Sequence, residues 1–449
     1  MRDKVVIPLW AAGIFLVVMN TTMFNVSLPR ILADLHISSS LGSWLISGYS
    51  IVFALSVVIF SRLSDWYPVR KLLMVGILLL VASCVIGFTA NNFPMAMLAR
   101  ILQAAGAGPM QGLGLVLATR YVPNDRRGKS ISLIAAGGSL AFGIGPVLGG
   151  FLTDSLGWNS LFLVTGLIVL LVPAYWKMLP SEKEFSFKKD QKFDIVGAGL
   201  LVIVIPSLLL SIGRLSWVNL LIAIVAFIVL VFHLRRSSNP FILPELFRNT
   251  AYRKMLFMSF CCFAINLGMV FLIPLVLNQV FGQSASFSGL MIFPGAILSA
   301  IMTPIIGRWI DQYGNYRLSF IGYIIMVVTF AGLIGFLTFS PYVLMAAYML
   351  LASSFSAVGA SLQNEVSRML PRKQLSSGVG VFQLTQFFGG ATATAVFGLL
   401  IARNPFESSS GIYRMNYVVL LTMTVLSLIM LIWYMRSKPV EPADHHIKI

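Results

Sequence analysis

The sequence predicts an all-helical protein that spans a membrane many times, and three observations lead to this fold class. Of its 449 residues, 58% are hydrophobic and only 10% are charged, whereas a soluble globular protein carries about 25% charged residues. The mean hydropathy of the chain is +0.88. Apolar runs of the length that a bilayer-spanning helix needs, about 20 residues, follow one another from end to end. These values exclude a soluble globular fold.

Fourteen apolar runs are predicted as transmembrane helices. In chain order they cover residues 7–29, 44–62, 71–90, 94–119, 130–153, 158–177, 193–213, 216–234, 254–279, 286–307, 317–339, 341–367, 376–402 and 414–435. The longest polar stretches, 181–194 and 235–250, enclose the seventh and eighth runs and leave six on either side. We therefore expect two six-helix bundles with an inserted helical pair between them. The predicted division is 1–180, 181–250 and 251–436, followed by a cytoplasmic tail at 437–449.

A short charged pattern occurs twice, and its two copies predict an internal duplication. Residues 61–71 read SRLSDWYPVRK and residues 307–317 read GRWIDQYGNYR, so the copies start 246 residues apart. Each copy follows the second helix of a predicted six-helix set. Two directly joined six-helix halves would place the copies roughly 200 residues apart, and the inserted pair accounts for the difference. Duplicated six-helix units are typical of secondary transporters.

The positive charge of the chain predicts its orientation in the membrane. The net charge is +17, and 27 of the 32 Lys and Arg residues fall in loops, helix ends or termini assigned to one side. Four (Arg30, Arg214, Arg403 and Arg414) fall on the other side, and Arg100 lies inside a run. Because cytoplasmic loops are enriched in Lys and Arg, we expect a multi-pass cell-membrane protein with both termini in the cytoplasm. The charge thus reports topology and does not imply nucleic acid as a partner.

The sequence lacks the patterns typical of an enzyme or a metal site. The three cysteines (Cys84, Cys261 and Cys262) lie inside predicted spans, and the histidines form no cluster with Asp or Glu. No GxxxxGK[ST] loop that would bind a nucleotide is present. We expect no enzymatic activity, metal or cofactor, so transport would run on an ion gradient. The alternative from another class is a non-transporting sensor or a membrane enzyme, in which the duplicated loops would have no function.

The two repeated loops carry charges that suit a gate between helices. Asp65, Arg70 and Lys71 in the first copy, and Asp311 and Arg317 in the second, are predicted in short cytoplasmic loops. An Asp beside a helix N-terminus gains from the helix dipole and can also pair with an Arg. Such a contact would form in one state of a rocking transporter and break in the other. The alternative is that these charges only follow the topology rule.

These loops resemble the signature loop of the major facilitator superfamily, Gly-x-Leu-x-Asp-x-x-Gly-x-Arg-Lys. Ser61 and Pro68 stand in the first copy where glycines are usual, and the second copy keeps Gly307 and Gly314. The resemblance implies the major facilitator fold, in which two six-helix bundles enclose a central cavity. We expect the first loop to be the stiffer of the two.

Arg100 lies well inside the fourth run, where a charge is costly. At the bilayer centre the cost is about 2.5–3.5 kcal/mol on insertion scales, so the side chain should face a cavity or a partner. The stretch resembles the superfamily's Arg-x-x-Gln-Gly pattern, with Gln103 in place and Ala104 instead of the glycine. The resemblance implies a role for Arg100 in proton transfer. The alternative is an arginine that reaches toward the headgroups.

The fifth run ends in a glycine-rich motif. Gly145, Pro146, Gly149 and Gly150 permit close helix contacts and local bending. They resemble the Gly-Pro-x-x-Gly-Gly ending of the superfamily's antiporter motif, which implies export. The alternative is a glycine-rich face that serves helix packing alone.

Further stretches resemble the fourteen-helix drug:proton antiporter branch, which includes bacterial tetracycline and multidrug exporters. In MNTTMFNVSLP (19–29), Asn20 takes the place of an acid found in many of these exporters, as it does in the tetracycline exporters. An amide can hydrogen-bond a drug but cannot take up a proton. The segments 193–200 and 288–314 also fit this branch, so the resemblance covers nearly the whole chain.

Proton uptake calls for an acidic side chain, and none of the fifteen acids lies at the middle of a predicted span. Glu365 and Asp154 are the deepest candidates and, together with Arg100, are the residues predicted to couple protons. Glu365 could instead pair with Arg368, which lies one helical turn away.

Amide side chains are the predicted lining of the substrate cavity. They are Asn20, Gln103, Gln111, Asn266, Gln363, Gln383 and Gln386. In the twelfth run one helical stripe is expected to face the cavity, formed by Ser353, Ser356, Ala360, Gln363 and Ser367. Without deep carboxylates, this chemistry favours a neutral, zwitterionic or anionic amphiphile over a dication. Alternatively, the amides hydrogen-bond one helix to another.

Together these features predict a proton-coupled exporter of hydrophobic or amphiphilic compounds, either tetracycline-like or of several drug classes. The expected partners are a small hydrophobic substrate, protons and the lipid bilayer, and the protein is expected to act as a monomer. An exporter of an endogenous lipid, fatty acid or metabolite is the alternative.

Overall fold

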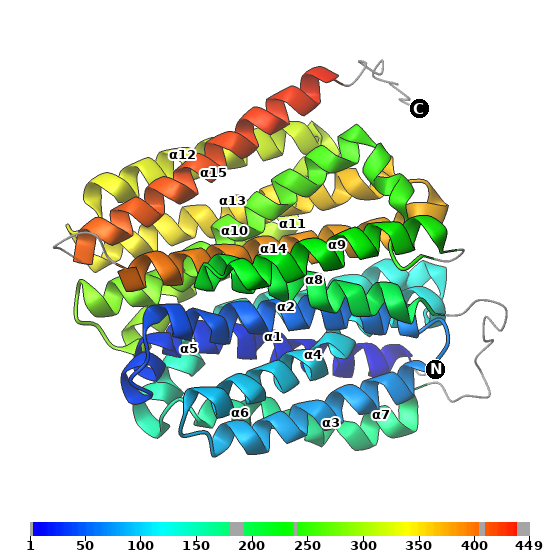
Figure 1. Cartoon of the computed structure of the whole chain (residues 1–449), viewed down its shortest axis with the longest axis horizontal. Helices are drawn as coiled ribbons and strands as arrows, with labels where there is room; N and C mark the ends of the chain where they lie inside the picture. The colour runs from blue at the N-terminus through cyan, green and yellow to red at the C-terminus, as the bar shows by residue number, and fades with distance from the viewer. Residues whose placement is uncertain (1–2, 180–192, 238–239, 404–408, 438–449) are drawn as a thin grey trace.

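A computed structural model of the chain describes residues 3–179, 193–237, 240–403 and 409–437 (Figure 1). These residues are helical almost throughout, and every predicted apolar run coincides with a helix or a group of helical segments. The predicted tail, apart from Ser437, and most of the loop before the inserted pair lie outside the described residues.

The helices of the first half are α1 (Asp3–Asp34), α2 (Ser39–Leu63), α3 (Val69–Phe88), α4 (Phe93–Tyr121), α5 (Asn124–Leu156), α6 (Ser160–Gly166), η1 (Leu167–Leu171) and α7 (Val172–Met178). Those that follow are α8 (Ile195–Arg214), α9 (Trp217–Arg236), η3 (Pro244–Arg248), α10 (Thr250–Gln279), α11 (Ala285–Tyr313), α12 (Asn315–Phe336), α13 (Pro341–Met369), α14 (Arg372–Arg403) and α15 (Ser409–Ser437).

The number of membrane spans is established only in part. Among the described residues, 12 helical segments are long and apolar enough to cross a membrane. The helices α4 and α5 are not among them: α4 carries Arg100, and α5 contributes a shorter apolar stretch, Leu140–Leu156. The protein is therefore an all-helical, multi-pass membrane protein, and the count of fourteen spans stays a prediction.

Polar side chains mark where many of these helices begin. Each accepts a hydrogen bond from a backbone N–H of the first helical turn, which would otherwise have no partner. These caps are Ser38, Asn92, Asp194, Ser216, Asn249, Ser284 and Ser340.

The sixth predicted run forms one candidate span, Ser160–Met178, but its helix is irregular. It consists of α6, the 3-10 segment η1 and α7. Pro173 stands at the start of α7. Because proline has no backbone N–H to donate to the preceding turn, the regular α-helical bonding is interrupted there.

The helices form two groups with the inserted pair between them (Figure 1). In the first group α1 packs against α5, and α4 packs against α2 and α3; in the second, α10 packs against α14 and α13 against α11 and α12. The groups meet along two seams, α2 with α14 and α5 with α11. The inserted helices α8 and α9 pack on each other, and α8 also contacts α2 and α14. The inserted pair therefore covers the first seam.

The chain enters and leaves the bundle at the same end (Figure 1). We call this the basic end, because the loops assigned the excess of Lys and Arg lie there. It holds the start of α1, the end of α15 and both repeated loops. The connections from α1 to α2, α5 to α6 and α10 to α11 lie at the opposite end, as do the end of α14 and the start of α15.

Candidate functional site

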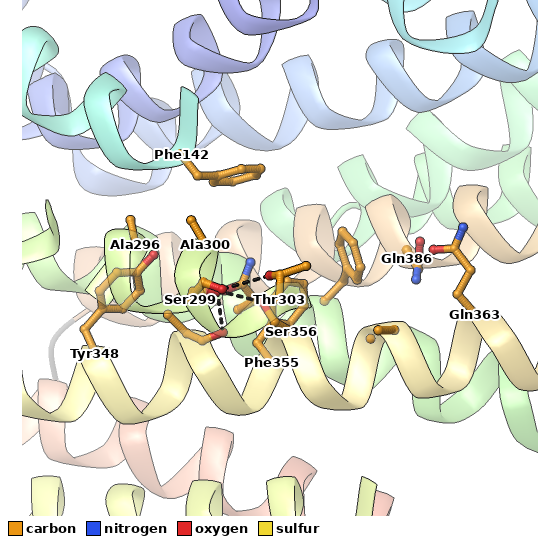
Figure 2. A pocket seen from close by; sticks show the side chains of 15 residues that line it. Phe142, Ala296, Ser299, Ala300, Thr303, Tyr348, Phe355, Ser356, Gln363 and Gln386 are labelled. Carbon is orange, nitrogen blue, oxygen red and sulfur yellow. Dashed lines mark hydrogen bonds between the residues drawn. The ribbon is translucent and has the colours of Figure 1, made fainter. Parts of the chain in front are cut away.

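A cavity of about 320 Å³ lies on the inner face of the second group of helices (Figure 2). Its walls come from α10, α11, α13 and α14, and α5 contributes one residue from the other group. The lining residues are Phe142, Phe263, Asn266, Ala296, Ser299, Ala300, Thr303, Tyr348, Ala352, Phe355, Ser356, Gly359, Ala360, Gln363 and Gln386.

The cavity is uncharged. Its described lining combines phenyl rings with hydroxyl and amide groups and contains no Asp, Glu, Lys, Arg or His. Phe142 approaches from α5 opposite Ser299 and Ser356, whose hydroxyls share a hydrogen bond of 2.6 Å between α11 and α13 (Figure 2). Such a surface suits a ligand with an aromatic or apolar body and a few hydrogen-bonding groups.

The cavity opens toward the basic end. Tyr348 and Ala296, which lie farther from that end, are buried, whereas Thr303, Ala360 and Gln363, which lie nearer to it, are exposed. A ligand would therefore reach the cavity from the basic end.

The structure brings three of the seven predicted amides into this cavity. Asn266, Gln363 and Gln386 line it, whereas Asn20 and Gln103 belong to a separate buried network on α1 and α4. Gln383 is half-buried on α14, outside the lining residues. Gln111 lies on α4 outside that lining, and its side-chain oxygen is buried without a hydrogen-bond partner in the described part of the chain.

The predicted stripe on α13 is only partly correct. Ser356, Ala360 and Gln363 line the cavity, but Ser353 lies on another face. It borders an apolar groove between α11, α12 and α13 and donates its hydroxyl to the carbonyl of Met349. Ser353 stands at the edge of the stripe, displaced by about 60° around the helix axis from Ser356.

Arg100 is enclosed within the first group, so it lines no part of the described cavity. Its Nη1 donates to Asn20 Oδ1 and to Gln103 Oε1, both at 2.7 Å, and its Nε donates to the Leu45 carbonyl at 3.1 Å. The guanidinium also lies between the rings of Phe24 and Tyr49, 4.0 and 3.9 Å from their centroids. Within the part of the chain that the structure describes, no carboxylate pairs with it. The buried charge is thus stabilised by oxygen dipoles and aromatic faces.

The rest of this network is made of neutral groups. Asn20 donates its amide to the Thr165 hydroxyl at 2.6 Å, and Gln103 donates to the same oxygen at 3.4 Å. Thr165 belongs to α6, so the network ties α1, α4 and α6 together around one cation. The arrangement fixes the position of the charge and offers no group that titrates near neutral pH.

A row of aromatic rings joins the cavity to this buried arginine. We call the row the aromatic chain: Phe355, Phe263, Phe387, Phe53 and Tyr49. Successive ring centroids lie 5.2, 5.7, 5.3 and 5.9 Å apart. Phe387 belongs to α14 and Phe53 to α2, so the contact between these two crosses the seam that separates the two groups.

The glycine-rich motif of α5 lies where three helices pack closely. A side chain at Gly145 would collide with Thr22, and one at Gly149 with Met23, both on α1. On the other side, a side chain at Gly150 would meet the backbone of Ala285 on α11. The carbonyl of Pro146 lies against Gly289 of α11. The motif therefore lets α5 touch both α1 and α11.

The two groups contact each other at the end opposite the basic end. There Gly398 of α14 lies against Ser43 and the Ser39 carbonyl of α2. Asp154, at the end of α5, accepts a hydrogen bond of 2.8 Å from the backbone N–H of Ser286 in the first turn of α11. Asp154 thus acts as a helix cap supplied by the other group, and it closes the second seam at this end.

The two repeated loops differ in backbone conformation, whereas the greater stiffness expected of the first loop stays a prediction. Pro68 is extended (φ −59°, ψ 137°) and precedes α3, whereas Gly314 adopts φ +82° and joins α11 directly to α12. A proline cannot reach a positive φ, so the two loops cannot be superimposed at this position. In the first loop Asp65 precedes α3, whereas Arg70 and Lys71 lie in its first turn. The guanidinium of Arg70 is 3.9 Å from the ring centroid of Trp176. In the second, Asp311 and Arg317 are exposed.

Glu365 holds the second loop in place. It is buried on α13, where Oε2 accepts from the Asn315 amide at 2.8 Å. Its Oε1 accepts from the hydroxyls of Tyr316 at 2.7 Å and of Tyr434 at 2.9 Å. Asn315 and Tyr316 open α12, and Tyr434 belongs to α15. The carboxylate therefore fastens the start of α12 to α13 and α15, away from the cavity.

Sequence reasoning missed Phe142, Tyr348 and the aromatic chain. Phenylalanines are spread over the whole chain, where most face lipid or core, so composition gives no signal for the few that line a cavity. The contact of Phe387 with Phe53 depends on how the two groups meet and has no counterpart in local sequence.

Comparison with known proteins adds a family and a fold. The family described as Major Facilitator Superfamily matches residues 10–394 and, in a second match, residues 255–447. The multidrug export protein EmrB of Haemophilus influenzae is 31% identical over 329 residues, which cover 70% of this chain and 64% of that protein. The riboflavin transporter RibZ of Clostridioides difficile is 23% identical over 454 residues, covering 97% of this chain and 99% of that protein.

The fold is shared with solved transporter structures. A crystal structure of the peptide transporter POT in complex with alafosfalin superimposes with a TM-score of 0.72, covering 96% of this chain and 94% of that one. At 15% sequence identity this likeness concerns the fold alone.

Proposed function

This chain belongs to the Major Facilitator Superfamily of secondary transporters, which are not enzymes, and we propose that it exports hydrophobic or amphiphilic compounds in exchange for protons. The transport class follows from the family. The direction, the substrate class and the proton coupling are the proposal.

The observation that carries the proposal is the uncharged, aromatic cavity open at one end. The basic end is the cytoplasmic end by the positive-inside rule, so the cavity faces the cytoplasm and the Asp154 contact closes the outer end. A compound dissolved in the cytoplasm or the inner leaflet can enter the cavity in this state. Separation of the two seams at the outer end, with closure at the basic end, would then release it outside.

The names of two relatives support this substrate class at different levels of detail. EmrB is a multidrug exporter, which favours a protein that accepts several hydrophobic compounds. RibZ is a riboflavin transporter, and a cavity of rings, hydroxyls and amides also fits a flat, hydrogen-bonding metabolite. Export of an endogenous metabolite is therefore the second candidate. A tetracycline-like substrate rests on Asn20 alone, and Asn20 belongs to the Arg100 network rather than to the cavity lining.

Proton coupling is proposed for Asp154, Glu365 and Arg100 in different roles. Asp154 is exposed at the outer end, where its carboxylate caps α11, so we assign it to the opening and closing of that end. Glu365 is the buried acid near the cytoplasmic end and can bind or release a proton there. Arg100 keeps its charge and sets the electric field inside the first group.

The proposal is tested with the full-length protein in proteoliposomes that carry an imposed pH gradient. A panel of neutral, cationic and anionic aromatic compounds is added, and proton release is followed with a pH-sensitive dye. We expect neutral compounds to drive proton counterflow and dications not to. Substrate movement without proton movement would contradict antiport, and preferential transport of dications would contradict the assignment of the cavity.

Arg100 provides the companion variants. Arg100→Lys keeps the charge but not the planar contact with Phe24 and Tyr49, whereas Arg100→Gln removes the charge. We expect Arg100→Gln to abolish proton release while Arg100→Lys retains part of it. Equal proton release in the wild type and Arg100→Gln would remove Arg100 from the coupling mechanism.

A further inference from the structure

Asp194 joins three parts of the chain at the basic end. Its Oδ1 accepts from the backbone N–H of Gly197 at 2.8 Å and so caps α8. The same oxygen lies 2.6 Å from Nε2 of His233, near the end of α9. Its Oδ2 accepts from the backbone N–H of Phe241 at 2.8 Å, in the segment that follows α9. One carboxylate thus holds both inserted helices and the chain that leaves them.

The charge of Asp194 is well suited to this role. Burial of the carboxylate raises its pKa, but the hydrogen bonds from Gly197, His233 and Phe241 outweigh that effect and hold the pKa below its usual value. Its side chain is 6% exposed and that of His233 is 27% exposed. The carboxylate therefore stays ionised near neutral pH and keeps all three contacts.

Two aromatic contacts lead from Asp194 to the first repeated loop. Phe193, its neighbour in the chain, packs edge-on against Trp66 at 5.5 Å and against Phe241 at 5.9 Å. Trp66 directly follows Asp65 in the first repeated loop. The start of the inserted pair therefore rests on that loop of the first group.

The segment 241–248 leads on to the second group. The backbone N–H of Leu243 donates to the Ser377 hydroxyl at 3.3 Å, and the Gln374 amide donates to Glu245 at 3.1 Å. Ser377 and Gln374 both belong to α14. Leu246 is fully buried. The chain after α9 is thus fixed to the basic end of α14.

These contacts form a continuous connection across the seam between α2 and α14. On one side is the first repeated loop, and on the other is the start of α14. Between them lie α8, α9 and the segment 241–248. We call the segment 241–248 the strap. In a rocking transporter the distance between these two sides changes as the basic end opens and closes. A connection at this place restrains that motion.

We propose that Asp194 is a positioning residue of the transport cycle, which fastens the strap and through it fixes the first repeated loop relative to α14. The inference rests on the proposed function for its transport consequence, but the mechanical connection can be measured without any substrate. In this proposal the inserted pair has a mechanical role: it limits how far the basic end opens on the α2–α14 side.

The test is a distance measurement across the strap. Tyr67 in the first repeated loop and Phe247 in η3 are 53% and 42% exposed, so both can be replaced by spin-labelled cysteine while the three native cysteines, which are buried, are not labelled. In the full-length protein we expect one narrow distance distribution. Asp194→Ala should broaden it, and Asp194→Asn, which keeps an acceptor for Phe241, should restore most of the narrow population.

Ser216→Ala is the matched control. Ser216 caps α9 at the opposite end of the inserted pair, so its loss removes the same kind of interaction without touching the strap. We expect Ser216→Ala to leave the distance distribution narrow, and Phe193→Leu, which keeps the cap of α8, to broaden it. A distribution that stays narrow in both Asp194→Ala and Phe193→Leu would overturn the proposal and leave Asp194 as a helix cap only.

Transport provides the second readout. For a compound that the wild type carries, Asp194→Ala should change the maximal rate about twofold or more, with the half-saturating concentration unchanged, because a conformational step is altered and the cavity is not. An altered half-saturating concentration at an unchanged rate would contradict a positioning role. If the wild type carries none of the panel, the proposed function fails while the distance result still decides the strap.

Discussion

At the scale of single residues, the three hydrogen bonds to Glu365 separate a structural role from a proton-carrying one. Tyr434→Phe removes one donor, and a hydrogen bond to a charged group contributes about 1.5–3 kcal/mol. We expect lower thermal stability of the purified protein and an unchanged pH profile of transport. Glu365→Gln should lower the thermal stability as well, and it should flatten the pH profile of transport if Glu365 carries the proton. A stability loss in Glu365→Gln with an unaltered pH profile would leave Glu365 as the fastener of the second loop.

The aromatic chain makes a second prediction at this scale. If Phe387 and Phe53 connect the cavity to Arg100, Phe387→Leu and Tyr49→Leu should affect ligand affinity non-additively. We expect a coupling free energy of about 0.5–1.5 kcal/mol, the magnitude of an aromatic pair, from binding titrations of the single and double variants.

Phe388→Leu is the control for that cycle. The ring centroids of Phe388 on α14 and Phe260 on α10 lie 5.9 Å apart, and neither residue belongs to the aromatic chain. Its effect should add to that of Tyr49→Leu within error. If the effects of Phe387→Leu and Tyr49→Leu on ligand affinity also add, the aromatic chain serves packing only and does not couple the cavity to Arg100.

The sequence indicates which polar residues need partners inside the protein, but not which way each side chain points. The cost of a buried charge correctly indicated that Arg100 needs partners inside the protein, and Asn266, Gln363 and Gln386 do line the cavity. Asn20 and Gln103 turned to Arg100 instead. In helices that are apolar on every side, no hydrophobic stripe tells which face a polar residue turns inward.

At the scale of helices, hydropathy located every long helix, but neither the short helix η3 nor the irregularity of the sixth run. The break between α6 and α7 falls in LIVLL followed by Val172 and Pro173, residues that are as apolar as a continuous span. The difference between the two repeated loops was visible in sequence, because Pro68 and Gly314 have incompatible backbone requirements. The strap was not visible, since Phe193 and Trp66 are far apart in the chain and meet only in the folded protein.

The strap also carries a pH prediction. Because the pKa of Asp194 is lowered in the folded protein, the stability that it contributes is complete above the ordinary value of 3.8 and is lost as the pH falls through the lowered value. We expect hydrogen exchange of the amides in the segment 241–248 to report an equally firm strap at neutral and mildly acidic pH. Release should occur only in strong acid. Loosening on mild acidification from neutral pH would contradict the role given to the ionised carboxylate.

At the scale of the whole molecule, we expect the hydrogen bond from Ser286 to Asp154 to help hold closed the end that we propose faces outside. Asp154→Ala removes the cap that α5 supplies to α11, so the outer seam should open more often. Spin labels at Leu156 and Phe339, both exposed at the outer end, should show a larger population at long distance. In Asp154→Asn the population at long distance should lie between those of the wild type and Asp154→Ala. The amide keeps a hydrogen-bond acceptor but loses the interaction of the charge with the helix dipole.

Ser155→Ala is the neighbour that controls for this variant, since the Ser155 hydroxyl donates to the Phe151 carbonyl of its own helix. Its distance distribution should match that of the wild type. If Asp154→Ala also matches the wild type, the closure of the outer end depends on the glycine contacts alone.

The duplicated loops predict a two-part architecture, whereas nothing in the sequence predicts which end of the molecule is open. Sequence spacing indicated two six-helix units and an inserted pair. Which end is open depends on contacts such as that of Gly150 with Ala285. Such contacts form between the units, and no local sequence pattern reports them.

The neutral cavity has an electrical consequence. If one proton enters for each uncharged molecule that leaves, every cycle moves one net positive charge inward, so export is electrogenic and the membrane potential alone can drive it. At 100 mV that charge supplies about 2.3 kcal/mol, which sustains roughly a 50-fold concentration ratio of substrate even without a pH difference. A cavity that required a monocationic substrate would exchange charge for charge and forgo this drive. The absence of a carboxylate among the cavity's described residues thus links the chemistry of the site to the voltage across the membrane.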